Sequence, residues 1–262
     1  MYNKAKSFIA QYWFFYLIGF FIVLGLKCFY RDADSNDLAW ILTPTARWVG
    51  ILSGLPFEYE PGIGYINHSF RFIIAPSCSG VQFMCISIAT LIYSFVHHME
   101  TKKKGVCWIA ISLALSYLFT IFVNGFRIVI SIYLPIYLHS SDMFNKWLTP
   151  ERLHTIIGTA VYFTSLLVLY RIAGYICRKI SDIPDSNTHG MPVFWYFFIV
   201  LGIPFLRKAY INDNGRFAEY AILITGICLT ILFAACLLTR IQKHWKKSSR
   251  LTHSGRIYDT KM

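Results

Sequence analysis

The sequence has few charged residues, and acidic residues are especially scarce. Charged residues make up 15% of its 262 residues, whereas a soluble domain carries about 25%. Hydrophobic residues reach 56%, and the mean hydropathy is +0.49. This composition excludes an ordinary soluble domain and a disordered chain. Because 25 Lys and Arg face only 13 Asp and Glu, the net charge is +12, which is typical of a nucleic-acid binder or of a membrane protein with basic residues on one side.

The sequence also lacks the ligand spacings of common metal sites. It has 7 cysteines and 8 histidines, but no Cys-x-x-Cys and no His-x-x-x-His occurs in it. These spacings recur in zinc sites and redox motifs. We therefore expect no metal ion and no cofactor.

The apolar residues are concentrated in six long runs. A helix needs about 20 mostly apolar residues to cross a bilayer core. The six runs, two of them near the short limit, are 8–28, 79–95, 105–123, 155–170, 191–206 and 218–239. We read the first as an uncleaved span, because no small-residue cleavage site follows it.

Basic residues are distributed unevenly between the two sides that these spans define. With the N-terminus inside, segments 1–7, 96–104, 171–190 and 240–262 hold 15 basic and 4 acidic residues, a net charge of +11. The rest of the chain holds 10 basic and 9 acidic residues, a net charge of +1. Lys and Arg mark the cytoplasmic side of membrane proteins. The asymmetry predicts that both termini are cytoplasmic, and it argues against nucleic-acid binding.

Two further segments are predicted on the outer side. Residues 38–55 are apolar but contain Pro44, Arg47 and two tryptophans, which favours a helix at the membrane interface. Residues 57–74 alternate between apolar and polar, which predicts a β-hairpin. Residues 128–138 are too short to span, so we expect them to complete the third spanning helix after a break or to lie at the outer interface. The predicted fold is an all-α membrane protein with about six spans and these two outer elements.

Cys78 lies where an extended segment meets a spanning helix, in Pro76-Ser77-Cys78-Ser79-Gly80. Unpaired N–H groups at a helix N-terminus favour an anion, and a thiolate there is a nucleophile. Ser77 or Ser79 could cap the helix. The alternative is an inert cysteine beside a capped helix.

Two more polar groups fall at the same predicted depth. Asn124 and Arg127 are three residues apart, so they share a face at the outer end of the third span. His154 begins the fourth span. Each has an ordinary explanation, since an arginine can extend to the headgroups and a histidine suits an interface. Brought together, however, Cys78, Arg127 and His154 would supply a nucleophile, an anion stabiliser and a proton shuttle.

The ordered set Cys78-Ser79-Gly80, Asn124-x-x-Arg127 and His154 resembles the exosortase/archaeosortase family of multi-pass prokaryotic membrane proteins. The resemblance extends over about 38–171, and a small bacterial variant such as the one lettered K is the nearest type. It implies that residues 1–178 form the exosortase-like membrane core, with the catalytic groups at its outer face. Residues 179–262 would then add two spanning helices and a basic cytoplasmic tail.

The resemblance also implies the reaction. Cys78 would be the nucleophile of a cysteine peptidase or transpeptidase, His154 the general acid and base, and Arg127 the thiolate or oxyanion partner. Asn124 would orient Arg127 or the helix break, and Ser79 and Gly80 would support the site. The partners would be exported proteins with a C-terminal signal of the PEP-CTERM kind, comprising a short motif, an apolar helix and a basic tail, together with membrane lipids.

Several alternatives stay open at the level of sequence. The site would face outward from the bacterial inner membrane, but neither the substrate motif nor the choice between hydrolysis and transfer to an amine can be read from these residues. A small transporter that uses Asn124 and Arg127 in a path through the membrane is one alternative. A non-catalytic export or assembly factor is another.

Overall fold

The chain folds almost entirely into helices. The computed structural model describes residues 2–138, 148–181, 190–208 and 214–258, with side chains over 12–138, 148–181, 190–205 and 217–241. Five helices are long and apolar enough to cross a membrane: Tyr12–Asp32, Pro76–His98, Lys102–Leu138, Pro150–Ile180 and Phe217–Ile241. The prediction of an all-α membrane protein is confirmed.

The sixth predicted span is close to its expected, short length. Residues 191–206 overlap the apolar stretch Gly190–Phe205, which is shorter than the other five helices. The stretch comprises α6 (Gly190–Phe197), a π-helical turn (Phe198–Gly202) and the start of α7 (Ile203–Lys208). Its spanning role therefore stays a prediction.

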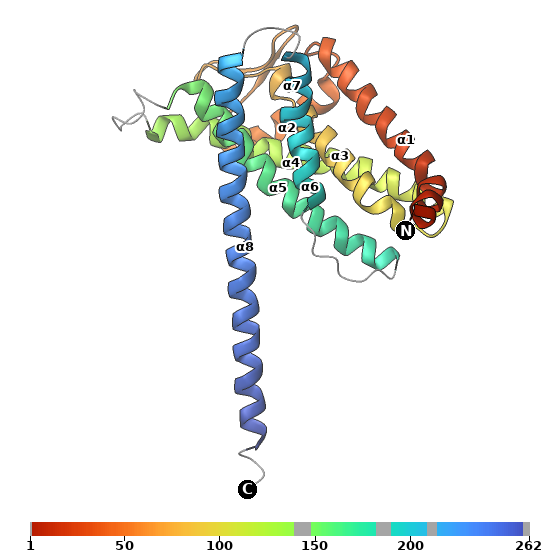
Figure 1. Cartoon of the computed structure of the whole chain (residues 1–262). Helices are drawn as coiled ribbons and strands as arrows, with labels where there is room; N and C mark the ends of the chain where they lie inside the picture. The colour runs from red at the N-terminus through yellow and green to blue at the C-terminus, as the bar shows by residue number, and fades with distance from the viewer. Residues whose placement is uncertain (1, 139–147, 182–189, 209–213, 259–262) are drawn as a thin grey trace. The chain divides into compact units, whose positions relative to one another are not determined.

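The chain divides into two compact units, residues 1–214 and 215–262. The second consists of α8 (Asn214–Tyr258), which contains the last apolar span. The first contains all the other helices and the sheet (Figure 1). The division expected at residue 178 separates an exosortase-like core from a C-terminal addition, so it concerns function rather than compactness, and it stays a prediction.

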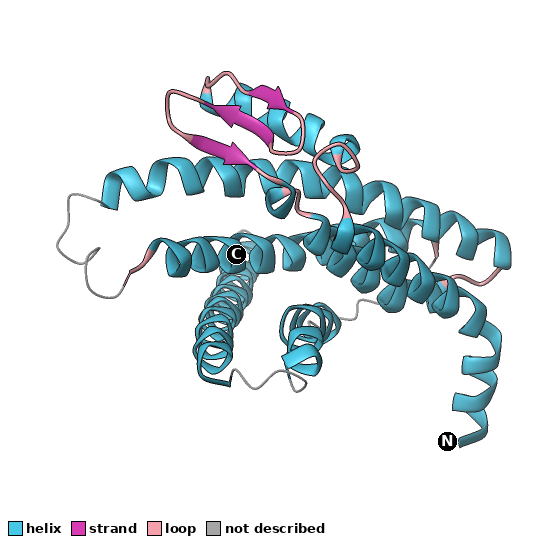
Figure 2. Cartoon of the chain, turned by 90° about the horizontal axis from the view of Figure 1, so that it is seen from above, coloured by secondary structure: helices cyan, strands magenta, loops and turns pink. Residues whose placement is uncertain are grey.

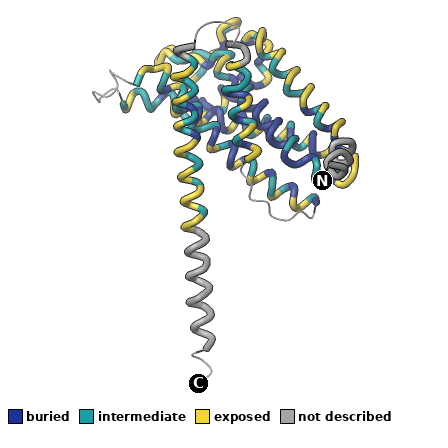
Figure 3. Tube along the Cα trace, viewed as in Figure 1, coloured by how far each residue is buried: buried dark blue, intermediate teal, exposed yellow. Residues whose placement is uncertain are grey.

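Helix α3 (Val81–Phe95) lies at the centre of the first unit. It packs against α1 (Tyr2–Asp32), α4 (Lys102–Leu138), α5 (Pro150–Ile180) and α6. Nearly all its side chains are buried, whereas many on α1 are exposed (Figure 3). The neighbouring helices therefore cover α3 on nearly all sides.

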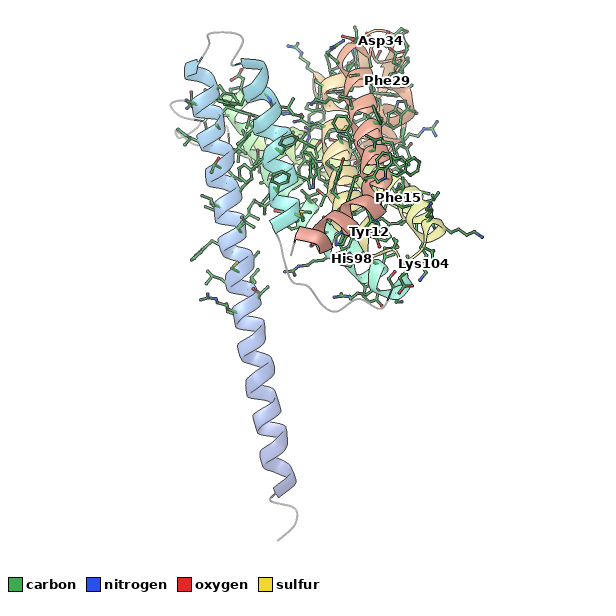
Figure 4. All side chains as sticks on the ribbon, turned by 45° about the vertical axis from the view of Figure 1, so that its right-hand side comes forward. Tyr12, Phe15, Phe29, Asp34, His98 and Lys104 are labelled. Atoms are coloured by element: carbon green, nitrogen blue, oxygen red, sulfur yellow. The ribbon has the colours of Figure 1, made fainter. Side chains whose placement is uncertain are left out.

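Helices α1 and α3 lie side by side and run in opposite directions. Tyr12 and Phe15, near the start of α1, lie at the same end as His98 and Lys104, whereas Phe29 and Asp34 lie at the other end (Figure 4). The basic segment that ends at Lys104 is therefore at the opposite end of the helices from the start of α3. The predicted topology puts these two segments on opposite sides of the membrane; which side is cytoplasmic stays a prediction.

Helix α4 is continuous over 37 residues. Residues 128–138 therefore complete the third spanning helix, as one of the two expected alternatives had it, but the break that it included is absent. Gly125, just before this segment, has a packing role. A Cβ there would lie 2.9 Å from Trp48 Nε1, and that nitrogen donates to the Phe122 carbonyl oxygen over 3.3 Å.

Helix α2 (Ala39–Ser53) packs on α4, where its Trp48 lies against Gly125. This helix confirms the one predicted at 38–55. Its buried residues Ile41, Leu42 and Val49 belong to the apolar core. The helix ends at Gly54, whose φ of +69° is left-handed and whose N–H donates to the Gly50 carbonyl oxygen. Such a glycine is a common helix terminator. Its position at a membrane interface stays a prediction.

The predicted hairpin is a three-stranded antiparallel sheet. The strands are β1 (Glu58–Glu60), β2 (Gly64–Asn67) and β3 (Phe72–Ile74), in the order β1-β2-β3, and Figure 2 shows them above the helices. A turn at Asn67 divides the second half of the expected hairpin into two strands. The Asn67 side chain stabilises this turn, since it donates to Pro56 O over 2.6 Å and accepts from Phe70 N–H over 2.8 Å. Tyr65 attaches the sheet to α2 by donating to Thr43 Oγ1 over 2.8 Å.

Candidate active site

Cys78 closes a short 3₁₀ turn, Pro76–Cys78, directly after strand β3. The Cys78 N–H donates to the Ala75 carbonyl oxygen over 2.8 Å, and the Ser79 N–H donates to that of Pro76 over 3.1 Å. The thiol is half-buried. The sequence correctly predicted the junction of an extended segment and a helix, but Cys78 precedes the α-helix by one tight turn.

Gly80 joins this turn to α3. Its φ of +79° is left-handed, a conformation that costs other residues free energy. A Cβ at Gly80 would lie 3.0 Å from Thr120 Cγ2 and 3.1 Å from the Asn124 amide. The residue that precedes α3 is thus Gly80 rather than a serine, although the buried Ser79 Oγ accepts from Val81 N–H over 3.5 Å. Gly80 allows α4 to approach the turn closely.

Asn124 is fully buried and connects the turn to two helices. Its Nδ2 donates to the Cys78 carbonyl oxygen over 2.6 Å. Its Oδ1 accepts from the Tyr162 hydroxyl of α5 over 2.7 Å. We expected Asn124 to orient Arg127 or a helix break, and the structure gives it these partners instead. Asn124 therefore holds the backbone of the nucleophile candidate.

Arg127 lies one helical turn from Asn124 and is also buried, with 5% of its surface exposed. Its Nε and Nη2 are buried without a hydrogen-bond partner among the residues that the structure describes. The guanidinium carbon lies 5.4 Å from the centre of the Tyr162 ring, within the range of a cation–π contact. An arginine that merely extended to the headgroups would be exposed, so its burial argues against that alternative.

His154 lies in the first two turns of α5 and is exposed. Helix α5 begins after Thr149, whose hydroxyl accepts from Arg152 N–H over 3.3 Å as a side-chain cap. His154 is close enough to Arg127 for their charges to interact. No hydrogen bond joins it to the Cys78 thiol among the described residues. The structure thus brings Arg127 and His154 into electrostatic range without forming a Cys–His pair.

Two tyrosines of this region were not predicted from the sequence. Tyr162 contacts both Asn124 and Arg127, and its ring stacks on Phe83 of α3 with centroids 4.7 Å apart. Tyr30, at the end of α1, donates to the Pro76 carbonyl oxygen over 3.5 Å and lies within electrostatic range of Cys78 and Arg127. Tyr162 stands in the apolar run 155–170 and Tyr30 just after the run 8–28. Neither has a local signal, because their partners lie on other elements.

The described part of the chain holds no group of three or more His, Cys, Asp or Glu side chains that could bind a metal ion. The polar groups that it does bring together, from α1, the Cys78 turn, α4 and α5, are a thiol, a guanidinium, an amide and two phenols. Such a set can hold and stabilise an anion and can carry out acyl transfer through sulfur.

The helices and this site define a multi-pass membrane protein with a cysteine-containing polar site between its helices. Comparison with known families identifies the kind: the family model of the transmembrane exosortases (Exosortase_EpsH) matches residues 2–171. The chain belongs to the transmembrane exosortase family, whose members process the sorting signals of exported proteins in the membrane. No curated protein and no solved structure matches the chain.

Proposed function

We propose that this protein is a cysteine peptidase or transpeptidase that removes the C-terminal sorting signal of exported proteins at the outer face of the bacterial inner membrane. The observation that carries the proposal is the Cys78 turn, which Asn124 holds over 2.6 Å next to a buried arginine with unpartnered nitrogens. Membership of the exosortase family supports the substrate class. The substrate would be an exported protein with a short motif, an apolar helix and a basic tail.

In the first step, the Cys78 sulfur attacks the carbonyl carbon that precedes the tail helix of the substrate. The C–N bond then breaks, a thioester forms, and the amine of the tail leaves with a proton. His154, exposed at the start of α5, supplies that proton from solvent and later removes one from the acceptor. In the second step, water or an acceptor amine attacks the thioester and releases Cys78.

Arg127 stabilises negative charge in this reaction, either on the thiolate or on the oxygen of the tetrahedral intermediate. Its burial supports the role, because a charge in low dielectric acts more strongly than one in water. Ser79 and Gly80 act by shaping the turn that carries the thiol.

The nucleophile is tested by co-expressing the full chain with an exported reporter that carries such a tail and by following tail removal on an immunoblot. We expect Cys78→Ala to abolish removal, because no other group provides the acyl acceptor. Cys28→Ala is the control, since Cys28 is a free and exposed thiol of α1. Tail removal by Cys78→Ala at the wild-type rate would refute the proposed mechanism.

The role of Arg127 has its own test. Arg127→Lys keeps the charge but loses the planar fork of N–H donors. We expect tail removal to slow by roughly 100- to 1,000-fold, the range seen when an oxyanion donor is removed. A wild-type rate in this variant would show that tail removal does not depend on the planar guanidinium of Arg127.

A further inference from the structure

Tyr162 contacts three residues on two other helices. From α5 its hydroxyl donates to Asn124 of α4, its ring stacks on Phe83 of α3, and the guanidinium of Arg127 lies over the same ring. Asn124 in turn donates to the carbonyl oxygen of Cys78. One side chain is therefore connected to both the proposed nucleophile and the proposed anion stabiliser.

The direction of these hydrogen bonds is fixed by chemistry. A backbone carbonyl can only accept, so the Asn124 amide must present its Nδ2 to Cys78. Its Oδ1 then faces Tyr162 and can only accept, so the phenol must donate. Asn124 is fully buried, and the reversed amide would leave a buried carbonyl oxygen against another carbonyl oxygen. The Cys78 carbonyl oxygen thus fixes the amide orientation, and the phenol completes it by donating to the other end of the amide.

We propose that Tyr162 is a positioning residue of this site: through Asn124 it holds the backbone turn of Cys78, and through its ring it holds the guanidinium of Arg127. The inference rests on the proposed function for the roles of Cys78 and Arg127. The restraint on the turn itself does not depend on that function, and it is tested first.

The first experiment measures the restraint without any substrate. The full chain in native membranes reacts with N-ethylmaleimide, and the labelling rates of Cys78 and Cys28 are read from their peptides by mass spectrometry. We expect Tyr162→Phe to raise the Cys78/Cys28 rate ratio by about fivefold, because the turn opens more often once one net hydrogen bond is lost. A loss of stability throughout the protein would also expose Cys85, a buried thiol of α3, so an unchanged labelling rate of Cys85 shows that the change is confined to the Cys78 turn.

Tyr93→Phe is the matched control. The Tyr93 hydroxyl also donates to a backbone carbonyl oxygen between helices, that of Tyr16, over 2.9 Å. It stacks on an aromatic ring as Tyr162 does, with centroids 5.3 Å apart. Tyr93 lies near the end of α3 that is remote from Cys78. The Cys78/Cys28 rate ratio of Tyr93→Phe should therefore equal that of the wild type.

A double-mutant cycle tests the connection through Asn124. Asn124→Ala alone should raise the labelling ratio, and Tyr162→Phe should add nothing to it, because both changes remove the same restraint. An unchanged ratio in Tyr162→Phe would overturn the inference, as would a double variant whose effects multiply.

Tail removal from the reporter then tests the second half of the inference. We expect Tyr162→Phe to slow removal by roughly tenfold and Tyr162→Leu, which also loses the ring beneath Arg127, to slow it by about a further fivefold. Equal rates in the two variants would overturn the role of the ring. If the labelling results hold while Cys78→Ala still removes the tail, the proposed function is wrong and the restraint on the turn is right.

Discussion

Gly80→Ala is the substitution whose effect follows most directly from the geometry of the site. At a φ of +79°, an alanine costs about 1–2 kcal/mol of conformational free energy. Its Cβ would also lie 3.1 Å from Cγ and Nδ2 of Asn124, so the amide has to move by a few tenths of an ångström. The hydrogen bond from Nδ2 to the Cys78 carbonyl oxygen would weaken, at a cost of about 1 kcal/mol.

Two losses are therefore expected. The free energy of unfolding should fall by about 2–3 kcal/mol in all. Tail removal from the reporter should slow by roughly tenfold, because a shift of a few tenths of an ångström is smaller than the displacement of about 1 Å that can cost about 100-fold. The measurements are thermal unfolding of the purified protein in detergent and the rate of tail removal in cells, normalised to the amount of protein in the membrane.

Gly62→Ala is the control for backbone strain. Gly62 has a nearly equal φ of +81°, and nothing lies within 4 Å of the position that its Cβ would take. It should lose about the same 1–2 kcal/mol and keep its rate of tail removal. Equal rates of tail removal in Gly80→Ala and Gly62→Ala would refute the argument that the Asn124 contact positions Cys78.

Three further substitutions have outcomes fixed by the structure. Asn124→Asp should slow tail removal by about tenfold or more on an immunoblot, because a carboxylate cannot donate to the Cys78 carbonyl oxygen; a wild-type rate would contradict this role. Gly125→Ala should lower the melting temperature by displacing Trp48, at a cost of about 1–3 kcal/mol, whereas Gly25→Ala, which meets no atom within 4 Å, should not; equal melting temperatures would be inconsistent with that packing. Thr149→Ala should lower stability by about 1 kcal/mol through loss of the cap of α5, and circular dichroism on heating would detect it.

The elements that the sequence predicted well are those with a strong local signal. Long apolar runs predicted the spanning helices, and the segment Pro76-Ser77-Cys78-Ser79-Gly80 predicted the junction of an extended segment and a helix. The pair Asn124 and Arg127 was expected on one helical face, and the structure buries both. In each case the spacing along the chain alone determines the geometry, so tertiary contacts were not needed to foresee it.

The errors arose where a residue acts through another part of the chain. A break before residues 128–138 was one alternative for the third spanning helix, but the helix is continuous there, and Gly125 accommodates Trp48, a residue 77 positions earlier. Tyr162 was not singled out, because a tyrosine in an apolar run has no distinguishing local signal. Its role depends on Asn124, which lies 38 positions away on another helix. Close approach and hydrogen bonding between helices are properties of packing, and one sequence does not display them.

The continuity of α4 has a consequence for the depth of the reaction. A 37-residue helix is about 55 Å long, whereas the hydrocarbon core measures about 30 Å. From Lys104 to Arg127 the helix axis rises by about 35 Å. If the lysines lie in one headgroup layer, Arg127 therefore lies just inside the opposite headgroup layer. In the proposed reaction, each residue added to the apolar segment of a substrate would displace its cleavage point by about 1.5 Å relative to this fixed depth. The length of that segment, and not only its motif, would then decide which exported proteins are cut.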